Sequence, residues 1–351
     1  MAAPSYNEAA TATLRQALAQ GNEPLVRQCL ENGADPTWQD QETGESVLMT
    51  ASRLGLADAV PALLAAGAPW NAIDRHGKCA GDYAIAAGHQ VIVDALVTAG
   101  VSAELIFGEM SRSELAAAPR NLDYLQSAAK YEGDLIQETT RDAVMMEWER
   151  PLMQAHAQAL FSDGARSVLN VGFGMGIIDE MFQSFGPVRH VISEAHPDVL
   201  KEMRRRGWFD KPNVFVAEGR WQDRIDEIIR NGPYDAVFFD TFGEHLDDLR
   251  EFHQRLPQLV SATGAYSFFN GMCPNNIFFQ GVACEVVRLD LRNLGFDCEF
   301  HRIEVDPGGD EVWAAVARRY FNSTDYYLPL AKRVVNQGSE EHRRDRKRAM
   351  E

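Results

Sequence analysis

Three glycines spaced two residues apart are the feature of this sequence best suited to holding a ligand. They are Gly172, Gly174 and Gly176, and they follow a short apolar run at 167–171. Glycine adopts backbone dihedrals that other residues resist, and its missing Cβ leaves room for a ligand against the chain. In an open α/β sheet, such a turn at the carboxyl end of the first strand is where a nucleotide-like cofactor binds. The pattern therefore predicts a strand, a cofactor-binding turn and a helix, in that order.

Two acids stand where later strands of the same sheet should end. Residues 190–194 and 234–240 are predicted strands, and they close with Glu194 and Asp240. Glu194 lies 22 residues after Gly172, where a carboxylate can accept hydrogen bonds from both hydroxyls of a ribose. A solvated strand end is the simpler alternative for Glu194. The run that ends at Asp240 is almost entirely apolar, as expected for a central parallel strand.

The spacing of the glycines bears on which cofactor would bind. The dinucleotide fingerprint is G-x-G-x-x-G, whereas this chain has G-x-G-x-G followed by Ile177, and no P-loop string occurs. Trp221 follows a third predicted strand at 214–218 and either flanks an adenine ring or belongs to the core. A glycine turn with a ribose acid but no phosphate-binding device favours S-adenosylmethionine, which carries a ribose and an adenine without a phosphate. An NAD-dependent oxidoreductase is the disfavoured alternative.

Five short strings are informative when they are taken together. They are V-G-F-G-M-G-I at 171–177, E-A-H at 194–196, G-R-W at 219–221, F-D-T-F at 239–242 and M-M-E-W-E-R-P-L-M at 145–153. Through these strings, the sequence resembles guanidinoacetate N-methyltransferase, and more closely the type IV protein arginine N5-methyltransferases, over about residues 120–320. Those arginine enzymes have Asn where this chain has Asn170, and they carry helical repeats before the catalytic domain; the small-molecule enzymes have Glu at that position.

The resemblance implies a class I, Rossmann-like methyltransferase domain that uses S-adenosylmethionine, with no metal. It implies that Glu149 and Asp240 are the catalytic acids, which grip a guanidinium group and accept its proton. Without the resemblance, Glu149 would be taken for a surface helix residue. The cofactor-binding residues that the resemblance implies are Tyr131, Met145, Gly172, Phe173, Gly174, Met175, Gly176, Ile177, Ile178, Glu194, Ala195, His196, Trp221, Gln222 and Asp240.

The function that follows from the resemblance is methyl transfer to the delta guanidino nitrogen of arginine in a protein. The product would be N5-methylarginine, and the resemblance suggests a ribosomal protein as the substrate. One alternative keeps the chemistry but acts on a small guanidino compound. An alternative of another class is a non-catalytic ankyrin interaction protein.

The first hundred residues repeat with a period of 33–34. Gly21, Gly55 and Gly88 are separated by 34 and 33 residues, and a second series, Gly33, Gly67 and Gly100, has the same spacing. A helix-sized apolar pattern lies within each period, which is typical of ankyrin repeats. We therefore expect an all-α, ankyrin-like domain. Such arrays present extended surfaces to partners, so the sequence favours partner binding over a merely covering role.

The expected organisation has four parts. Ankyrin-like repeats occupy 1–104, a linker 105–125, the methyltransferase domain 126–330, and a basic, disordered tail 331–351. After the central strands, we expect a fifth strand at 264–269, a helix at 275–294, and closing strands at 298–300 and 312–317.

Composition restricts the class of protein and its partners. The 351 residues carry 34 basic and 51 acidic side chains, a net charge of −17, which disfavours direct nucleic-acid binding and favours basic protein partners. No apolar run is long enough to cross a membrane, and the first residues do not read as a signal peptide. The five cysteines form no C-x-x-C pair, which is typical of a reducing compartment. We expect a cytoplasmic protein, and the basic run at 342–348 leaves a nuclear location as an addition.

Overall fold

The computed structural model divides the chain into two compact units. The repeat unit contains residues 1–117 and 273–286, and the sheet unit contains residues 118–272 and 287–351. Each unit is described by itself. The residues that the structure describes are 6–114, 122–132, 135–137, 143–242, 246–317 and 319–334.

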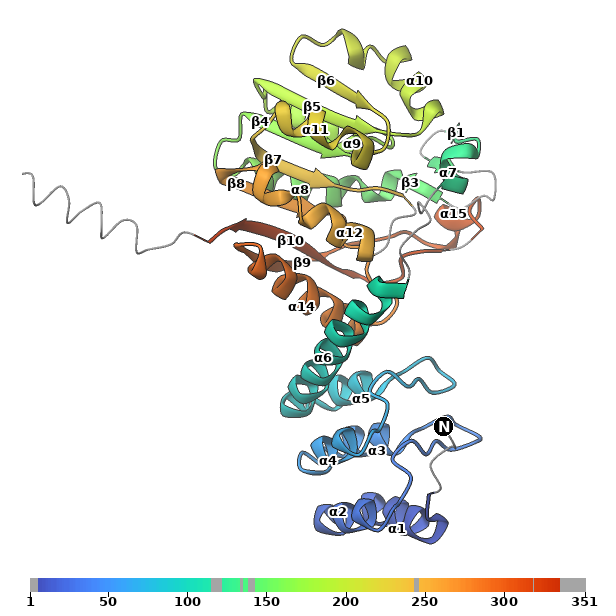
Figure 1. Ribbon diagram of the computed structural model, residues 1–351. Helices are drawn as coiled ribbons and strands as arrows, with labels where there is room; N and C mark the ends of the chain where they lie inside the picture. Colours follow the sequence, from blue (N-terminus) through green and yellow to red (C-terminus); the bar gives the residue numbers. More distant parts are fainter. Residues whose placement is uncertain are drawn as a thin grey trace, which may run out of the picture. The chain divides into compact units, whose positions relative to one another are not determined.

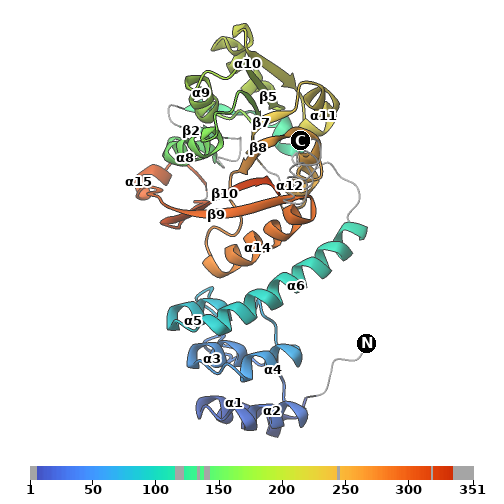
Figure 2. The same ribbon diagram turned by 90° about the vertical axis from the view of Figure 1, so that its left-hand side faces the viewer.

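Three successive helix pairs form most of the repeat unit (Figures 1 and 2). The glycines of the 33–34-residue period end these helices in the left-handed region, with φ of 74° at both Gly55 and Gly88. A side chain with a Cβ resists that conformation, which is why glycine recurs there. The helices are α1 (Glu8–Ala19), α2 (Glu23–Glu31), α3 (Val47–Leu54), α4 (Ala59–Ala65), α5 (Ala80–Ala87) and α6 (Gln90–Glu114).

The last repeat departs from the expected pattern at Gly100. This glycine lies inside α6, and the helix continues through the first ten residues of the expected linker, to Glu114. A Cβ at Gly100 would lie 3.0 Å from the ring of Trp70 and 3.1 Å from Val282. Close packing, rather than a turn, therefore explains the third glycine of that series.

A segment from far along the chain completes the repeat unit. The first part of α14 (Ile277–Asn293) places Phe278 against Gly81, where a Cβ would lie only 2.0 Å from the ring. Phe278 also packs 6.3 Å from Trp70, between ring centroids. Asn276, just before the helix, donates a 2.7 Å hydrogen bond to Asp82. The repeats therefore pack with residues that the sequence assigned to the methyltransferase domain.

The sheet unit is built on a seven-stranded sheet with strand order β6-β5-β4-β7-β8-β10-β9. The first five strands in this order are parallel, and β10 is antiparallel to both of its neighbours. Since the chain reverses its direction of winding between β4 and β7, their carboxyl ends flank a ligand crevice. The strands are β4 (Ser167–Val171), β5 (Arg189–Glu194), β6 (Val214–Glu218), β7 (Tyr234–Phe239), β8 (Val260–Phe268), β9 (Phe296–Glu304) and β10 (Asp325–Arg333).

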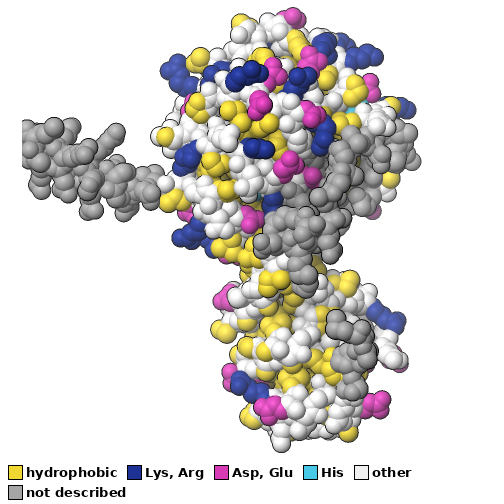
Figure 3. Space-filling view, in the orientation of Figure 1, with side chains coloured by type: hydrophobic (Ala, Val, Ile, Leu, Met, Phe, Trp, Pro, Cys, Tyr) yellow, Lys and Arg dark blue, Asp and Glu magenta, His cyan; other side chains and the backbone are white. Residues whose placement is uncertain are grey.

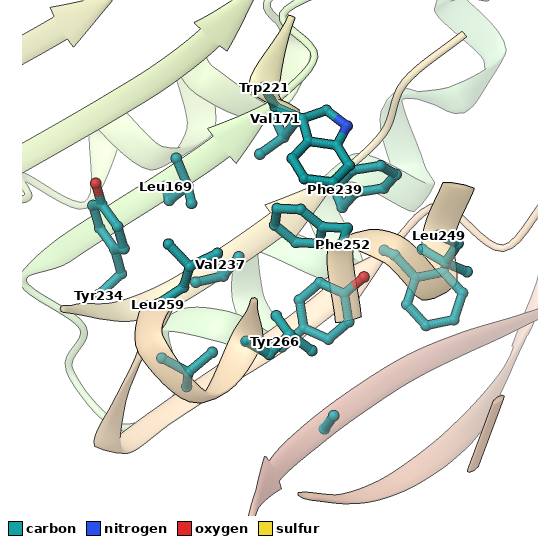
Figure 4. Packing of buried hydrophobic residues seen from close by; sticks show 14 of the residues in the cluster. Leu169, Val171, Trp221, Tyr234, Val237, Phe239, Leu249, Phe252, Leu259 and Tyr266 are labelled. Atoms are coloured by element: carbon teal, nitrogen blue, oxygen red, sulfur yellow. The ribbon is translucent and has the colours of Figure 1, made fainter. Parts of the chain in front are cut away.

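Alternation along the central strands gives the sheet two apolar faces. Leu169 and Val171 of β4 join one core with α11–α14, whereas Val168 joins another with α8 and α9. Figure 4 shows Leu169, Val237 and Tyr266 among the side chains of the first core. The helices of this unit are α7 (Leu122–Gln126), α8 (Arg150–Phe161), α9 (Ile177–Ser184), α10 (Pro197–Arg205), α11 (Trp221–Arg230), α12 (Leu246–His253), α13 (Leu256–Leu259) and the carboxyl-terminal part of α14.

The closing strands differ from the sequence expectation. Residues 312–317 were expected to form a strand, and this was wrong, because they form the end of α15 (Asp310–Trp313) and a turn. Trp313 is buried and its indole donates to the carbonyl of Pro307, so it packs as part of a compact loop. The strand that completes the sheet is β10, which ends at Arg333 and so includes the first three residues of the expected tail. Residues 335–351 of that tail lie outside the described part.

Smaller elements belong to the same unit. Before β4 lie the short helix η1 (Glu147–Glu149) and a three-stranded antiparallel sheet, β1 (Lys130–Glu132), β2 (Leu135–Gln137) and β3 (Ala143–Met146). A second short helix, η2 (Trp208–Asp210), lies between α10 and β6. No helix in the described part of the chain is both long and apolar enough to cross a bilayer. The described residues also contain no cluster of His, Cys, Asp and Glu that could hold a metal ion.

Candidate cofactor and substrate site

The glycine turn joins β4 to α9 in a conformation that only glycine tolerates. Gly172, Gly174 and Gly176 have φ of 95°, 53° and 75°. A Cβ at Gly172 would lie 1.8 Å from the carbonyl oxygen of Asp240, so the turn passes directly against the end of β7. The backbone N–H of Asp240 in turn donates to Val171, at 2.8 Å. Two neighbouring strand ends therefore hold the turn in place.

Glu194 ties the same turn to the end of β5. Its buried carboxylate accepts hydrogen bonds from the backbone N–H groups of Phe173, at 2.9 Å, and of Ala195 and His196, both at 2.7 Å. Burial raises the pKa of Glu194, while these three donors act in the opposite direction. The side chain is thus part of the framework of the turn as well as of the pocket wall, and the solvated strand end is excluded.

A pocket opens at this edge of the sheet, with an empty volume of about 630 Å³ that is partly open to solvent. Eight of the residues expected to bind a cofactor line it, and the others in its wall come from α7, β3 and the ends of β4–β7. The eight are Met145, Gly172, Gly174, Glu194, Ala195, Trp221, Gln222 and Asp240.

Trp221 lies both at the wall of the pocket and in the hydrophobic core, the two places that the sequence left open for it. It lines the pocket, yet only 3% of its surface is exposed and it packs 5.2 Å from Phe252, between ring centroids. Figure 4 shows its ring beside Phe239 and Phe252. The amide of Gln222 is placed to accept from the Trp221 indole and from Arg220, each at 3.3 Å. The first turn of α11 is therefore a fixed wall of the pocket.

Six of the remaining residues of the expected cofactor set lie outside the pocket lining. Phe173 packs its ring on Trp208, at 5.2 Å, and His196 caps α10 and contacts the carbonyl of Ser127. The backbone of Tyr131 is in β1, but its side chain lies outside the described residues. The others, Met175, Gly176, Ile177 and Ile178, shape the turn or fill the core beneath α9.

Some lining residues were absent from the expected cofactor set, although one of them, Phe242, ends the F-D-T-F string at 239–242. Tyr124 of α7 and Phe242 both line the pocket, and their rings lie 4.7 Å apart. Tyr124 also lies 4.7 Å from the ring of His196. Two separate segments therefore meet over the cofactor pocket through aromatic contacts, and only the fold brings them together.

Glu149 is buried beside this pocket, at the junction of η1 and α8. Its Oε1 accepts hydrogen bonds from the backbone N–H of Met146, at 2.9 Å, and from the hydroxyl of Tyr320, at 2.5 Å. Its Oε2 accepts none from the described part of the chain. Trp148 and Trp313 pack around Tyr320, at 6.0 and 5.0 Å between ring centroids. One oxygen of Glu149 is thus held and the other is available to a ligand.

Asp240 lies close enough to Glu149 for the two carboxylates to repel. Burial, and then the charge of Asp240, raise the pKa of Glu149 to about 8, and burial raises the pKa of Asp240 to about 7. The carboxylate of Asp240 takes no hydrogen bond or ion pair from a described residue. Two acids whose charged forms are disfavoured by burial, and which pair with no cation in the described part of the chain, would bind a cation such as a guanidinium strongly.

Comparison with known proteins decides the family. The family model described as guanidinoacetate N-methyltransferase matches residues 120–267, and a model of three ankyrin repeats matches residues 14–105. Protein arginine N-methyltransferase 2 of Saccharomyces cerevisiae is 33% identical over 307 residues, covering 75% of this chain and 74% of the relative. That of Kluyveromyces lactis is 32% identical over 381 residues, covering 91% of each chain.

This chain belongs to the protein arginine N-methyltransferase 2 family. A third relative of that name, from Yarrowia lipolytica, is 40% identical over 232 residues, which cover 63% of this chain and 49% of the relative. Membership of the protein arginine N-methyltransferase 2 family confirms the prediction of a methyltransferase enzyme. It also confirms the expected fold, with ankyrin repeats before a Rossmann-like sheet domain.

Proposed function

We propose that the protein transfers a methyl group from S-adenosylmethionine to the delta guanidino nitrogen of an arginine in a protein. The observation that carries this proposal is the pair of Glu149 and Asp240. Glu149 is buried, Asp240 lines the pocket, and neither Oε2 of Glu149 nor the carboxylate of Asp240 accepts a hydrogen bond from a described residue. A guanidinium is planar and always charged, and its N–H groups match carboxylate oxygens in number and direction. The names of the relatives support arginine as the substrate.

The residues of the pocket fit S-adenosylmethionine. The backbone of Gly172 and Gly174 lines the pocket directly, and Glu194 stands at the position of a ribose-binding acid. Trp221 and Phe242 provide apolar walls for an adenine ring. The described part of the chain offers no phosphate-binding string, which agrees with a cofactor that has no phosphate. When bound, this cofactor supplies the electrophilic methyl group.

The two acids then have separate tasks in the transfer. Glu149 presents a single oxygen, Oε2, because Met146 and Tyr320 hold Oε1. It therefore grips one edge of the guanidinium and orients it. Asp240 follows β7 beside the glycine turn. It binds the edge of the guanidinium whose nitrogen lies nearest to the cofactor. A carboxylate with a raised pKa is also a competent acceptor for the proton that the nitrogen loses.

The delta nitrogen follows from the resemblance to the type IV enzymes, whereas single methylation and a protein substrate rest on two further arguments. Two acids that hold one guanidinium in a fixed orientation present one nitrogen to the methyl group, so a single methylation is expected. The ankyrin repeats offer a surface for a protein partner, which a small-molecule enzyme would not need. A net charge of −17 favours a basic partner, such as a ribosomal protein. On the visible face of the sheet unit, acidic and basic side chains are mixed, not gathered by sign (Figure 3).

Labelled methyl transfer tests the proposal. The purified protein is incubated with a cell lysate and S-adenosylmethionine carrying a labelled methyl group, and the modified peptides are sequenced by mass spectrometry. We expect N5-methylarginine in a protein, with no dimethylarginine. Guanidinoacetate is tested in parallel, and its methylation in place of any protein would contradict the proposal.

A further inference from the structure

A hydrogen-bonded network lies buried behind the cofactor turn, on the side of the sheet covered by α9. Asn170, Asp179 and His190 are fully buried in it. The amide nitrogen of Asn170 lies 2.8 Å from Oδ2 of Asp179 and 2.8 Å from the carbonyl oxygen of Gly172. Asp179 Oδ1 lies 2.9 Å from His190 Nε2, and Gln183 contacts the other ring nitrogen of His190, also at 2.9 Å. None of these side chains lines the pocket or takes part in the proposed transfer.

The direction of each hydrogen bond in this network is determined by chemistry. The amide nitrogen of Gln183 can only donate, so Nδ1 of His190 accepts and its Nε2 carries the proton. His190 therefore donates to one oxygen of Asp179, and Asn170 donates to the other. A carboxylate that accepts at both oxygens is a stable partner in a buried site.

Asp179 in this way orients the amide of Asn170. If the amide were reversed, its oxygen would face two acceptors, Asp179 and the carbonyl of Gly172. The observed orientation leaves only Oδ1 of Asn170 without a partner. The nitrogen is consequently directed at Gly172, the residue whose φ of 95° starts the turn and whose backbone lines the pocket.

We propose that Asn170 is a positioning residue for the cofactor turn, oriented by Asp179 and His190, and that the turn requires a hydrogen-bond donor at position 170. The carbonyl of Gly172 is the group that it fixes. With this carbonyl fixed, the backbone of the turn faces the pocket and does not collide with the carbonyl oxygen of Asp240. This inference rests on the proposed cofactor, because its readout is the affinity for S-adenosylhomocysteine, the product form.

Exchanging the two side chains separates cofactor affinity from folding. In Asn170→Asp, two acceptors face each other and Gly172 loses its donor. In the double variant, Asn170→Asp with Asp179→Asn, the amide now at position 179 donates to the carboxylate now at position 170, but nothing donates to Gly172. For both variants of the full chain, S-adenosylhomocysteine affinity is measured by titration calorimetry and stability by urea unfolding.

We expect Asn170→Asp to lose both stability and affinity, the latter by about tenfold to a hundredfold, as for one unsatisfied buried carbonyl. The exchanged double variant should recover the urea midpoint while its affinity stays weak. Asn213→Asp is a matched control, since the amide of Asn213 donates to the carbonyl of Pro187 at 2.9 Å, away from the pocket lining. It should bind S-adenosylhomocysteine as the wild type does.

The double variant decides the matter even if Asn170→Asp fails to fold. Normal affinity in the double variant would overturn the proposal, because the donor at position 170 would then be dispensable. Wild-type affinity in Asn170→Asp would overturn it as well. Failure of the wild-type protein to bind S-adenosylhomocysteine would refute the proposed cofactor instead, so the two failures are distinguishable.

Discussion

The hydroxyl of Tyr320 offers a direct way to test how Glu149 works. It donates to Oε1 of Glu149, and this bond favours the ionised carboxylate against the burial and the charge of Asp240 that raise its pKa to about 8. Replacing Tyr320 by Phe removes the bond and keeps the ring that packs on Trp313. The pKa of Glu149 should therefore rise further.

The size of the effect follows from the energy of that bond. A hydrogen bond to a charged group contributes about 1.5–3 kcal/mol, and one pH unit in a pKa corresponds to about 1.4 kcal/mol. The pKa of Glu149 should thus move from about 8 to about 9 or 10 in Tyr320→Phe. Since the ionised acid holds the guanidinium, kcat/KM should rise with pH in both proteins, but at higher pH in the variant.

The assay is the pH profile of kcat/KM between about pH 6 and pH 10, which reports the ionisations of the free enzyme. Near pH 7.5 the variant should be about tenfold to eightyfold less active than the wild type, and the gap should narrow at the alkaline end. Tyr83→Phe is a matched control, because the hydroxyl of Tyr83 donates to Asp74, at 2.8 Å, in the repeat unit. A uniform loss at every pH, or a profile that coincides with the wild type, would refute the reasoning.

Three further predictions use the same structure. Asp240→Asn and Glu149→Gln should each lower turnover by about 10²-fold or more in a labelled methyl-transfer assay, and turnover near that of the wild type would contradict their roles. Because the pKa of Glu149 and that of Asp240 are raised, the folded protein binds more protons than the unfolded chain does. The free energy of unfolding of the wild type, measured in urea, should therefore fall as pH rises from about 5 to 8. In Glu149→Gln this fall in stability should be smaller. Gly81→Val should lower the unfolding temperature, because its Cβ would meet Phe278, whereas S-adenosylhomocysteine affinity measured by calorimetry should stay near the wild-type value; a thermal scan that matches the wild type would disprove this packing.

Local sequence was sufficient for the elements whose signal is contained in a few residues. The glycine turn was predictable because three left-handed positions at 172, 174 and 176 demand glycine whatever surrounds them. The buried parallel strands were predictable because unbroken apolar runs suit no other place. The repeats were predictable from their period. Glu149 came only from family resemblance, since an acid beside an apolar helix has no distinctive local signal.

Other features depended on residues that are distant in the sequence. The run at 312–317 has strand-like composition, but Trp313 finds its partners in the loop at Pro307 and in Tyr320, and the strand position goes to β10. Phe278 was assigned to the methyltransferase domain, yet it packs against Gly81 of the repeats. Pairwise contacts of this kind are decided by shape and burial in the folded chain.

Backbone preference and side-chain type along the chain specify the types of element and the glycine turn, whereas the roles of Glu149 and Asp240 come from family resemblance and stay predictions. The folded chain shows in addition that Oε1 of Glu149 is held while its Oε2 accepts no hydrogen bond from a described residue, that burial raises the pKa of both acids, and that Asp179 orients Asn170 toward Gly172. Each of these depends on burial and on the direction of a hydrogen bond between elements, and both arise only when separate parts of the chain exclude water together.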